Sequence, residues 1–159
     1  MCEIQVHERA VDWFIIPKKI AGRKGRLNIM KILVGYDGSN VAASALRLAA
    51  RHAKAFDAEV HIVTSLVKAG DRELDQITAS EKGLEQAHTL FEQEGVRCDT
   101  HLLIRGLTSG EDLVQFAKEN DIDEIIVGVK RRSKVGKLLM GSTAQYVILK
   151  SPCPVVSIK

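Results

Sequence analysis

The sequence is poor in aromatic residues, which make up only 4% of its 159 residues. Unpaired bases stack on aromatic side chains, so this scarcity argues against a platform for single-stranded nucleic acid. Cysteine is scarce as well, and the chain has no C-x-x-C pair and an odd number of thiols. The three are Cys2, Cys98 and Cys153. Free thiols in a reducing compartment fit this pattern best, and we expect a cytoplasmic protein.

Patterns for metal binding and for catalysis are also missing. The five histidines show no ligand spacing with cysteine or with one another, so we predict no metal site. The predicted loops hold no serine, cysteine or lysine nucleophile beside a recognisable base. Asp37 alone would make a poor general base near pH 7. We therefore expect that the protein is not an enzyme.

No long hydrophobic run is present. In residues 1–29 the only apolar run is Trp13-Phe14-Ile15-Ile16, which is too short to cross a membrane and lacks the layout of a secretory signal. These 29 residues carry six basic and three acidic side chains, whereas residues 30–159 carry 17 of each. The balanced charge of the second part predicts neither a nucleic-acid nor a membrane partner.

Residues 1–29 look foreign to the rest of the chain and leave several interpretations open. Met30 begins a segment that reads like the natural start of a domain, so translation could begin there and the preceding residues be a start-site artefact. Alternatively, residues 1–29 form a basic extension, either disordered or used for docking or targeting. Residues 30–159 are expected to form one domain.

From Met30 onward, short apolar segments alternate with segments of helical periodicity. We predict strands at 31–36, 60–66, 96–104, 124–127 and 155–158. The helices expected between them cover 41–56, a long segment with an apolar face from Leu74 to Phe91 that ends at Gly95, a segment that begins with a capping box at Thr108, and a last one that ends at Lys150. Apolar strands with helical crossovers require a parallel sheet covered on both faces, so we predict a doubly wound α/β domain.

Two loops rich in glycine and polar residues follow the first and fourth predicted strands. They are Asp37-Gly38-Ser39 and residues 128–142. Ligands of doubly wound sheets bind beyond the carboxyl ends of the strands, where the winding direction changes. With five strands in the order 3-2-1-4-5, the two loops would flank the same crevice.

The second loop has the composition of an anion site. It contains five basic residues, namely Lys130, Arg131, Arg132, Lys134 and Lys137. It leads into a helix start at Gly141-Ser142-Thr143, where free backbone N–H groups and the helix dipole favour an anion. We interpret the loop as a phosphate-binding element; the alternative is a solvated basic loop.

This loop fits neither of two common nucleotide motifs. A Walker A loop, G-x4-G-K-[ST], would require a glycine where Arg131 stands and a hydroxyl where Leu138 stands. No G-x-G-x-x-G follows the first strand, so a dinucleotide-binding Rossmann domain is not expected.

Four segments together carry a family pattern. They are K-I-L-V-G-Y-D-G-S from Lys31, D-x-I-I-V-G ending at Gly128, a loop near the signature G-x2-G-x9-G-[ST], and the ending P-C-P-V-V. Over residues 30–159 the chain thus resembles the universal stress protein family. The resemblance implies a five-stranded α/β fold with four helices of the adenine nucleotide alpha hydrolase-like type. It also implies a homodimer and, as in many members, an ATP site.

The resemblance implies roles for individual residues. Asp37 would contact the adenosine part, Val127 and Gly128 would line the ribose–phosphate path, and the helix start would hold phosphates. The full candidate site comprises Gly35, Tyr36, Asp37, Ser65, Val127, Gly128, Arg131, Gly141, Ser142 and Thr143. Arg131 stands where the family signature has its second glycine; its guanidinium can pair with phosphate, but it cannot adopt every glycine backbone geometry.

The sequence therefore predicts a cytoplasmic stress-response protein that binds ATP or a related adenine nucleotide, with Mg²⁺ as a companion ion. The resemblance implies that the homodimer pairs through the last strand, Val155 to Ile158. The alternative is a dimeric interaction module that has lost the nucleotide. A nucleotide-transferring enzyme ranks third, and slow ATP hydrolysis stays open.

Overall fold

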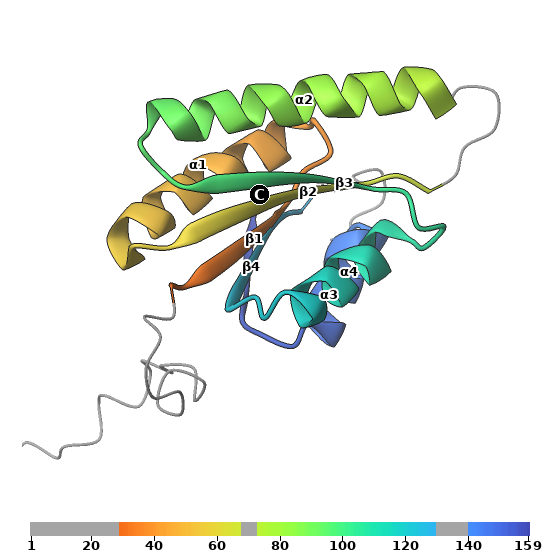
Figure 1. The fold of residues 1–159 in the computed structure, drawn as a ribbon. Coiled ribbons are helices and arrows are strands. Elements are labelled where there is room, and N and C mark those ends of the chain that lie inside the picture. The colour runs from red at the N-terminus through yellow and green to blue at the C-terminus, as the bar shows by residue number, and fades with distance from the viewer. Residues whose placement is uncertain (1–28, 68–72, 130–139) are drawn as a thin grey trace, which may run out of the picture.

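The structure is a computed structural model that describes residues 29–67, 73–129 and 140–159. It contains a parallel sheet of five strands in the order β3-β2-β1-β4-β5, as the sequence predicts (Figure 1). The strands are β1 (Lys31–Gly35), β2 (Glu59–Ser65), β3 (Cys98–Leu103), β4 (Glu124–Gly128) and β5 (Val155–Ile158). The helices are α1 (Asn40–Phe56), α2 (Glu73–Gln93), α3 (Ser109–Glu119) and α4 (Ser142–Lys150).

The helices cover the sheet in two layers, with α1 and α2 on one face and α3 and α4 on the other (Figure 1). Alternate residues of the central strands serve the two layers. Ile32 and Val34 of β1 pack with α1 and α2, whereas Leu33 between them packs toward α3 and α4. All three are fully buried. A strand buried on both faces must be apolar throughout, which is why no polar residue interrupts the middle of β1.

The helix starts follow the capping residues expected from the sequence. Ser39 is the N-cap of α1, and its Oγ accepts a hydrogen bond from the backbone N–H of Ala42 at 3.3 Å. Thr108 caps α3 in a reciprocal capping box, in which Glu111 accepts from the backbone N–H of Thr108 at 2.9 Å. Such caps satisfy backbone donors that a helix start otherwise leaves without a partner.

Helix α2 differs from the expectation at its beginning. The predicted apolar face ran from Leu74 to Phe91, and its later members Leu84, Ala87 and Phe91 are indeed buried. Leu74, however, is 79% exposed. The start of α2 extends beyond the carboxyl ends of the strands (Figure 1), so the apolar side chains of its first turn have no sheet to pack against.

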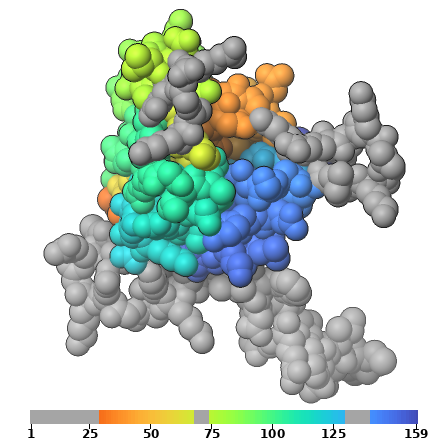
Figure 2. Space-filling view, turned by 90° about the vertical axis from the view of Figure 1, so that its right-hand side faces the viewer, coloured from red at the N-terminus to blue at the C-terminus, as the bar shows by residue number. Residues whose placement is uncertain are grey.

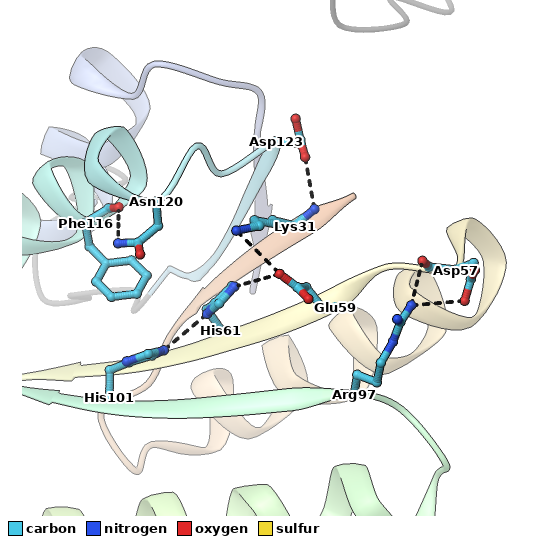
Figure 3. Close-up of polar contacts among 9 residues, drawn as sticks. All are labelled: Lys31, Asp57, Glu59, His61, Arg97, His101, Phe116, Asn120 and Asp123. Atoms are coloured by element: carbon cyan, nitrogen blue, oxygen red, sulfur yellow. Dashed lines mark hydrogen bonds and ion pairs between the residues drawn. The ribbon is translucent and has the colours of Figure 1, made fainter. Parts of the chain in front are cut away.

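Charged side chains pair with one another at the amino ends of the strands (Figure 3). The backbone N–H of Lys31 donates to Asp123 Oδ2 at 3.0 Å, and Lys31 Nζ lies 3.5 Å from Glu59 Oε1. At the start of β4, Glu124 Oε1 lies 2.7 Å from His52 Nδ1 of α1. These contacts tie the beginnings of β1, β2 and β4 to each other and to α1.

Two histidines that looked unrelated in sequence meet on the sheet face covered by α3. His61 Nδ1 of β2 lies 3.2 Å from His101 Nε2 of β3, and both rings lie near Phe116 of α3 (Figure 3). Burial lowers the pKa of His101 below its usual value, and His61 lowers it further, while Asp99 acts in the opposite sense.

Within the described part of the chain, no helix is both long and apolar enough to span a membrane.

Candidate functional site

A cleft of about 230 Å³ lies at the carboxyl ends of β1, β2 and β4. Figure 2 looks onto this end of the molecule, where the first residues of α1 (orange), α3 (green to teal) and α4 (blue) come together. The lining consists of Gly35, Tyr36, Asp37, Ser39, Ala42, Val63, Ser65, Ser109, Leu113, Val127, Gly128, Gly141, Ser142, Thr143 and Ala144. The position is the switch point of the sheet, because connections from β1 and β4 leave it toward opposite faces.

The cleft unites nine of the ten residues in the sequence-predicted site. Those from the first strand and its loop, from the end of β2, from the end of β4 and from the start of α4 all line it. The tenth, Arg131, lies outside the residues that the structure describes, as does most of the basic loop. The two segments that the sequence placed opposite one another, Asp37 and Gly141 to Thr143, therefore share one cavity.

The start of α4 presents its backbone to this cleft. Gly141 is the N-cap residue, and it forms no side-chain cap hydrogen bond. The first helical bond is donated by the N–H of Gln145 to the carbonyl of Gly141 at 3.0 Å, so the N–H groups of residues 142–144 precede the helical ladder. Residues 142–144 all line the cleft. An uncapped helix start of this kind is suited to binding an anion through N–H groups and the helix dipole.

Two glycines shape the cleft for different reasons. A Cβ on Gly128 would lie 2.8 Å from Val41 Cγ1 and 3.2 Å from the backbone N of Ala42, so glycine lets the end of β4 approach α1 closely. Among the residues that the structure describes, a Cβ on Gly141 would meet nothing within 4 Å. Gly141 also has φ −60°, which any residue can adopt. Its lack of a side chain is therefore not needed by the fold, and it leaves the helix start open.

Hydrogen bonds between strand ends hold the cleft floor in place. The hydroxyl of Thr64 donates to the carbonyl of Tyr36 at 2.9 Å, and the N–H of Tyr36 donates to the carbonyl of Val63, also at 2.9 Å. Beyond them, Asp37 Oδ1 accepts from the N–H of Ser39 at 3.1 Å, which orients the turn into α1. The Asp37 side chain consequently lies at the rim of the cleft and is exposed.

Sequence reasoning missed the wall that α3 contributes. Ser109, the first residue of α3, lines the cleft and its Oγ contacts the carbonyl of Ser65 at 3.4 Å. Behind Ser65 lies Asp112, fully buried, whose Oδ2 accepts a hydrogen bond from Ser65 Oγ at 2.5 Å. The capping box at Thr108 could have located this wall, because a helix that follows β3 and packs beside β2 must begin at the same end of the sheet.

The lining favours non-covalent binding of a polar ligand. It combines six hydroxyl side chains with backbone groups, and of its described residues Asp37 alone carries a carboxylate while none is histidine, cysteine or lysine. In the described part of the chain, no three histidine, cysteine, aspartate or glutamate side chains are grouped so as to hold a metal ion.

The fold is matched by known proteins. The model of the universal stress protein family matches residues 28–159. A universal stress protein of Methanocaldococcus jannaschii is 31% identical, over 94% of this chain and 92% of its own length. Among solved structures, a universal stress protein from Archaeoglobus fulgidus superposes with a TM-score of 0.73 at 35% identity, covering 82% of this chain and 93% of the other.

A second structure of a universal stress protein from Archaeoglobus fulgidus was solved in complex with dAMP. It is similar to this chain with a TM-score of 0.69 and 34% identity, covering 82% of this chain and 98% of the other. The family match and the curated relative identify the same family, and the solved structures share its fold. The chain belongs to the universal stress protein family.

Proposed function

We propose that this protein binds an adenine nucleotide, ATP or a relative of it, in the cleft between the ends of β1, β2 and β4. The observation that carries the proposal is the uncapped start of α4, which opens into the same cavity as Asp37. Phosphate would lie on the backbone N–H groups and hydroxyls of residues 142 and 143. The dAMP complex of the Archaeoglobus fulgidus relative supports this choice of ligand.

The proposed ligand orientation follows from the cleft. With phosphates at the start of α4, Val127 and Gly128 lie along the ribose–phosphate path, and the nucleoside extends across β1 toward β2. Asp37 at the rim would accept hydrogen bonds from ribose hydroxyls or from the base. Mg²⁺ would accompany a triphosphate through phosphate oxygens, as is usual for this small, strongly hydrated ion. Arg131 would add a charge to the phosphates.

In the cell we propose a cytoplasmic stress-response role in which bound nucleotide changes the shape or assembly of a dimer. Catalysis is not part of this role, and the described residues of the lining include no histidine, cysteine or lysine. The alternative function is a dimeric interaction module without nucleotide. The interaction module would have the same fold and the same dimer as the nucleotide-binding protein, and the two functions differ only in whether a nucleotide is bound.

A titration with ATP, ADP and AMP, followed by calorimetry, tests the proposal. Gly141→Val is the informative variant, because it adds a side chain at the cleft lining where a Cβ meets none of the described residues within 4 Å and the backbone conformation suits valine. We expect affinity to fall about 100-fold, or by roughly 2.7 kcal/mol. The melting temperature of the ligand-free variant should be unchanged. Ala79→Val, on the exposed face of α2, is the matched control and should bind like the original protein.

Wild-type protein that binds no adenine nucleotide would favour the interaction module. Equal affinity in the wild type and in Gly141→Val would contradict the assignment of phosphates to the α4 start.

The proposed homodimer would form at β5, which ends the strand order on one side of the sheet. The carbonyl of Pro154 accepts a hydrogen bond from the N–H of Ile125 in β4 at 3.0 Å, and that of Ile158 accepts one from the N–H of Val129, just after β4, at 2.7 Å. Because backbone groups of successive strand residues point to opposite edges, the N–H of Ser157 faces away from β4. Apolar side chains of the adjoining α4 are also exposed: Tyr146 at 36% and Leu149 at 70%.

Ser157→Pro removes an outward-facing donor and leaves the bonds to β4 intact, since proline is tolerated where a strand N–H faces an open edge. Sedimentation velocity should show a dimer for the wild type and for the control Ser157→Ala, and a monomer for Ser157→Pro. A dimer that persists in Ser157→Pro would place the interface elsewhere.

A further inference from the structure

Helix α2 has a glycine at its middle that neither the fold nor the proposed function has explained. Gly83 lies midway along α2, which spans Glu73–Gln93. Glycine in a helix interior lowers stability relative to alanine, because it leaves the unfolded chain more freedom to lose. Its φ is not positive, since the described glycines with positive φ are Gly38, Gly95 and Gly106. The helix backbone would therefore accept alanine, and the reason for glycine lies in its surroundings.

Gly83 lies against the ring of Tyr36. A Cβ added to Gly83 would be 3.3 Å from Tyr36 Cε1 and 4.0 Å from the phenolic oxygen. Apart from the backbone of α2 and the two chain neighbours of Gly83, no other described residue comes within 4 Å of that Cβ. A Cβ at 3.3 Å is a tight contact, so even alanine would require the ring to move. The glycine thus makes room for one side chain, that of Tyr36.

The ring of Tyr36 extends from the cleft to α2. Tyr36 follows β1 and lines the cleft, whereas α2 packs on β2 and β3. Because β2 lies between β1 and β3, the ring reaches past the end of β2 to meet Gly83. Tyr36 also packs against the core between the sheet and helices α1 and α2. Its side chain therefore separates the cleft from this core.

The main chain of Tyr36 is held by β2. Its N–H donates to the carbonyl of Val63 and its carbonyl accepts from Thr64 Oγ1, both at 2.9 Å. A side chain that pushed outward from α2 would consequently meet a ring whose backbone is fixed on both sides. The ring would have to turn about its side-chain bonds, and the space beside it that is not filled by the core is the cleft.

We propose that Gly83 is a positioning residue of the nucleotide site, which lets the ring of Tyr36 lie back against α2 and keeps the cleft wide enough for the ligand. The ring edge with Cε1 and the hydroxyl faces α2, so Tyr36 serves the site as a wall and not through its hydroxyl. The described lining includes no residue of α2. This inference rests on the proposed nucleotide site and adds α2 to the elements that shape it.

The test is a calorimetric titration with AMP of the full-length protein and its variants. Gly83→Val should bind AMP about tenfold more weakly than the wild type, and Gly83→Ala about threefold more weakly, because each turns the ring toward the ligand. Tyr36→Phe retains the ring and should bind within about twofold of the wild type. Thr89→Val is the matched control, since it places the same side chain at an exposed position of α2 and should not change the affinity.

A double-mutant cycle distinguishes positioning from a general disturbance of α2. In a Tyr36→Ala background no ring stands in the way, so adding Gly83→Val should not weaken AMP binding further. In a Tyr36→Phe background the ring remains, and Gly83→Val should again cost about tenfold in affinity. A general loosening of the helix would weaken binding equally in both backgrounds.

The outcomes separate this inference from the proposed function. Wild-type protein that does not bind AMP would refute both. If the wild type binds AMP and Gly83→Val binds it equally well or better, the nucleotide site stands and the role of Gly83 is overturned. A loss that persists undiminished in the Tyr36→Ala background would also overturn it. Should Gly83→Val not fold, the same comparison with Gly83→Ala decides.

Discussion

At the amino ends of β1, β2 and β4 the first residues are charged, namely Lys31, Glu59 and Glu124, whereas the last residues of the same strands are Gly35, Ser65 and Gly128. Lys31 pairs with Glu59 and binds Asp123 through its backbone N–H (Figure 3), and Glu124 pairs with His52. The small residues instead surround a cleft. One end of the sheet is thus closed by its own side chains, and the other leaves backbone groups available to a ligand. Stability and binding should therefore respond to substitutions at opposite ends.

The largest effect should come from a substitution at the open end that the fold itself cannot accept. In Gly128→Val the side chain would meet Val41 and the backbone of Ala42, so β4 and α1 would have to separate. Overpacking of this kind costs about 1–3 kcal/mol in the free energy of unfolding. Nucleotide affinity should fall as well.

Chemical denaturation measures this cost, with Gly141→Val as the comparison. Both are glycine-to-valine changes at the cleft, but only Gly128 faces crowded backbone. If the two variants lost stability equally, the distinction between the two glycines would be wrong.

A substitution at the amino ends of the strands should have a smaller effect on the free energy of unfolding. Glu124 Oε1 contacts His52 Nδ1 at 2.7 Å, and only 13% of the glutamate side chain is exposed. Glu124→Gln replaces a charged acceptor by a neutral one and should cost about 1 kcal/mol in the free energy of unfolding. Nucleotide affinity should stay as in the wild type, because Glu124 lies at the far end of β4.

The control is Glu94→Gln, whose partner Lys54 is half exposed, as Glu94 is. Exposed pairs contribute little, so this variant should change stability by less than about 0.5 kcal/mol. Weaker nucleotide binding in Glu124→Gln would show that the two ends of the sheet are coupled.

The smallest expected effect is on the pH dependence of the free energy of unfolding, and it comes from the pair of His61 and His101. Burial and the neighbouring His61 lower the pKa of His101, so the folded protein binds this proton less readily than the unfolded chain does. The contribution of His101 to the free energy of unfolding is therefore fully present above the pKa of the unfolded chain, about 6.5. It is lost as the pH falls below that value.

Unfolding free energies measured from pH 8 to pH 5.5 should therefore decrease, and His101→Gln should weaken that decrease. His88→Gln, an exposed site on α2, is the control. A pH profile unaltered by His101→Gln would exclude this histidine as its source.

The fold class and the strand order could be predicted from the sequence, because buried strands are apolar throughout and alternate with helical segments. The candidate site residues came from the resemblance to the family, and nine of the ten line one cleft. Leu74 was misjudged, since periodicity does not tell where a sheet ends beneath a helix. Asp112 and the pair of His61 with His101 were missed for another reason. Their partners lie 47 and 40 residues away along the chain, and only the register of β2 with β3 and the packing of α3 bring them together.

The open surroundings of Gly141 have a consequence for the history of such a protein. The backbone at this position suits residues other than glycine, and a Cβ there meets none of the described residues within 4 Å, so one substitution could end ligand binding at little cost to folding. Nucleotide-binding and nucleotide-free descendants of one ancestor would then differ by a single step and remain otherwise alike. The residue at this position could therefore report, across related sequences, which lineages have kept a ligand.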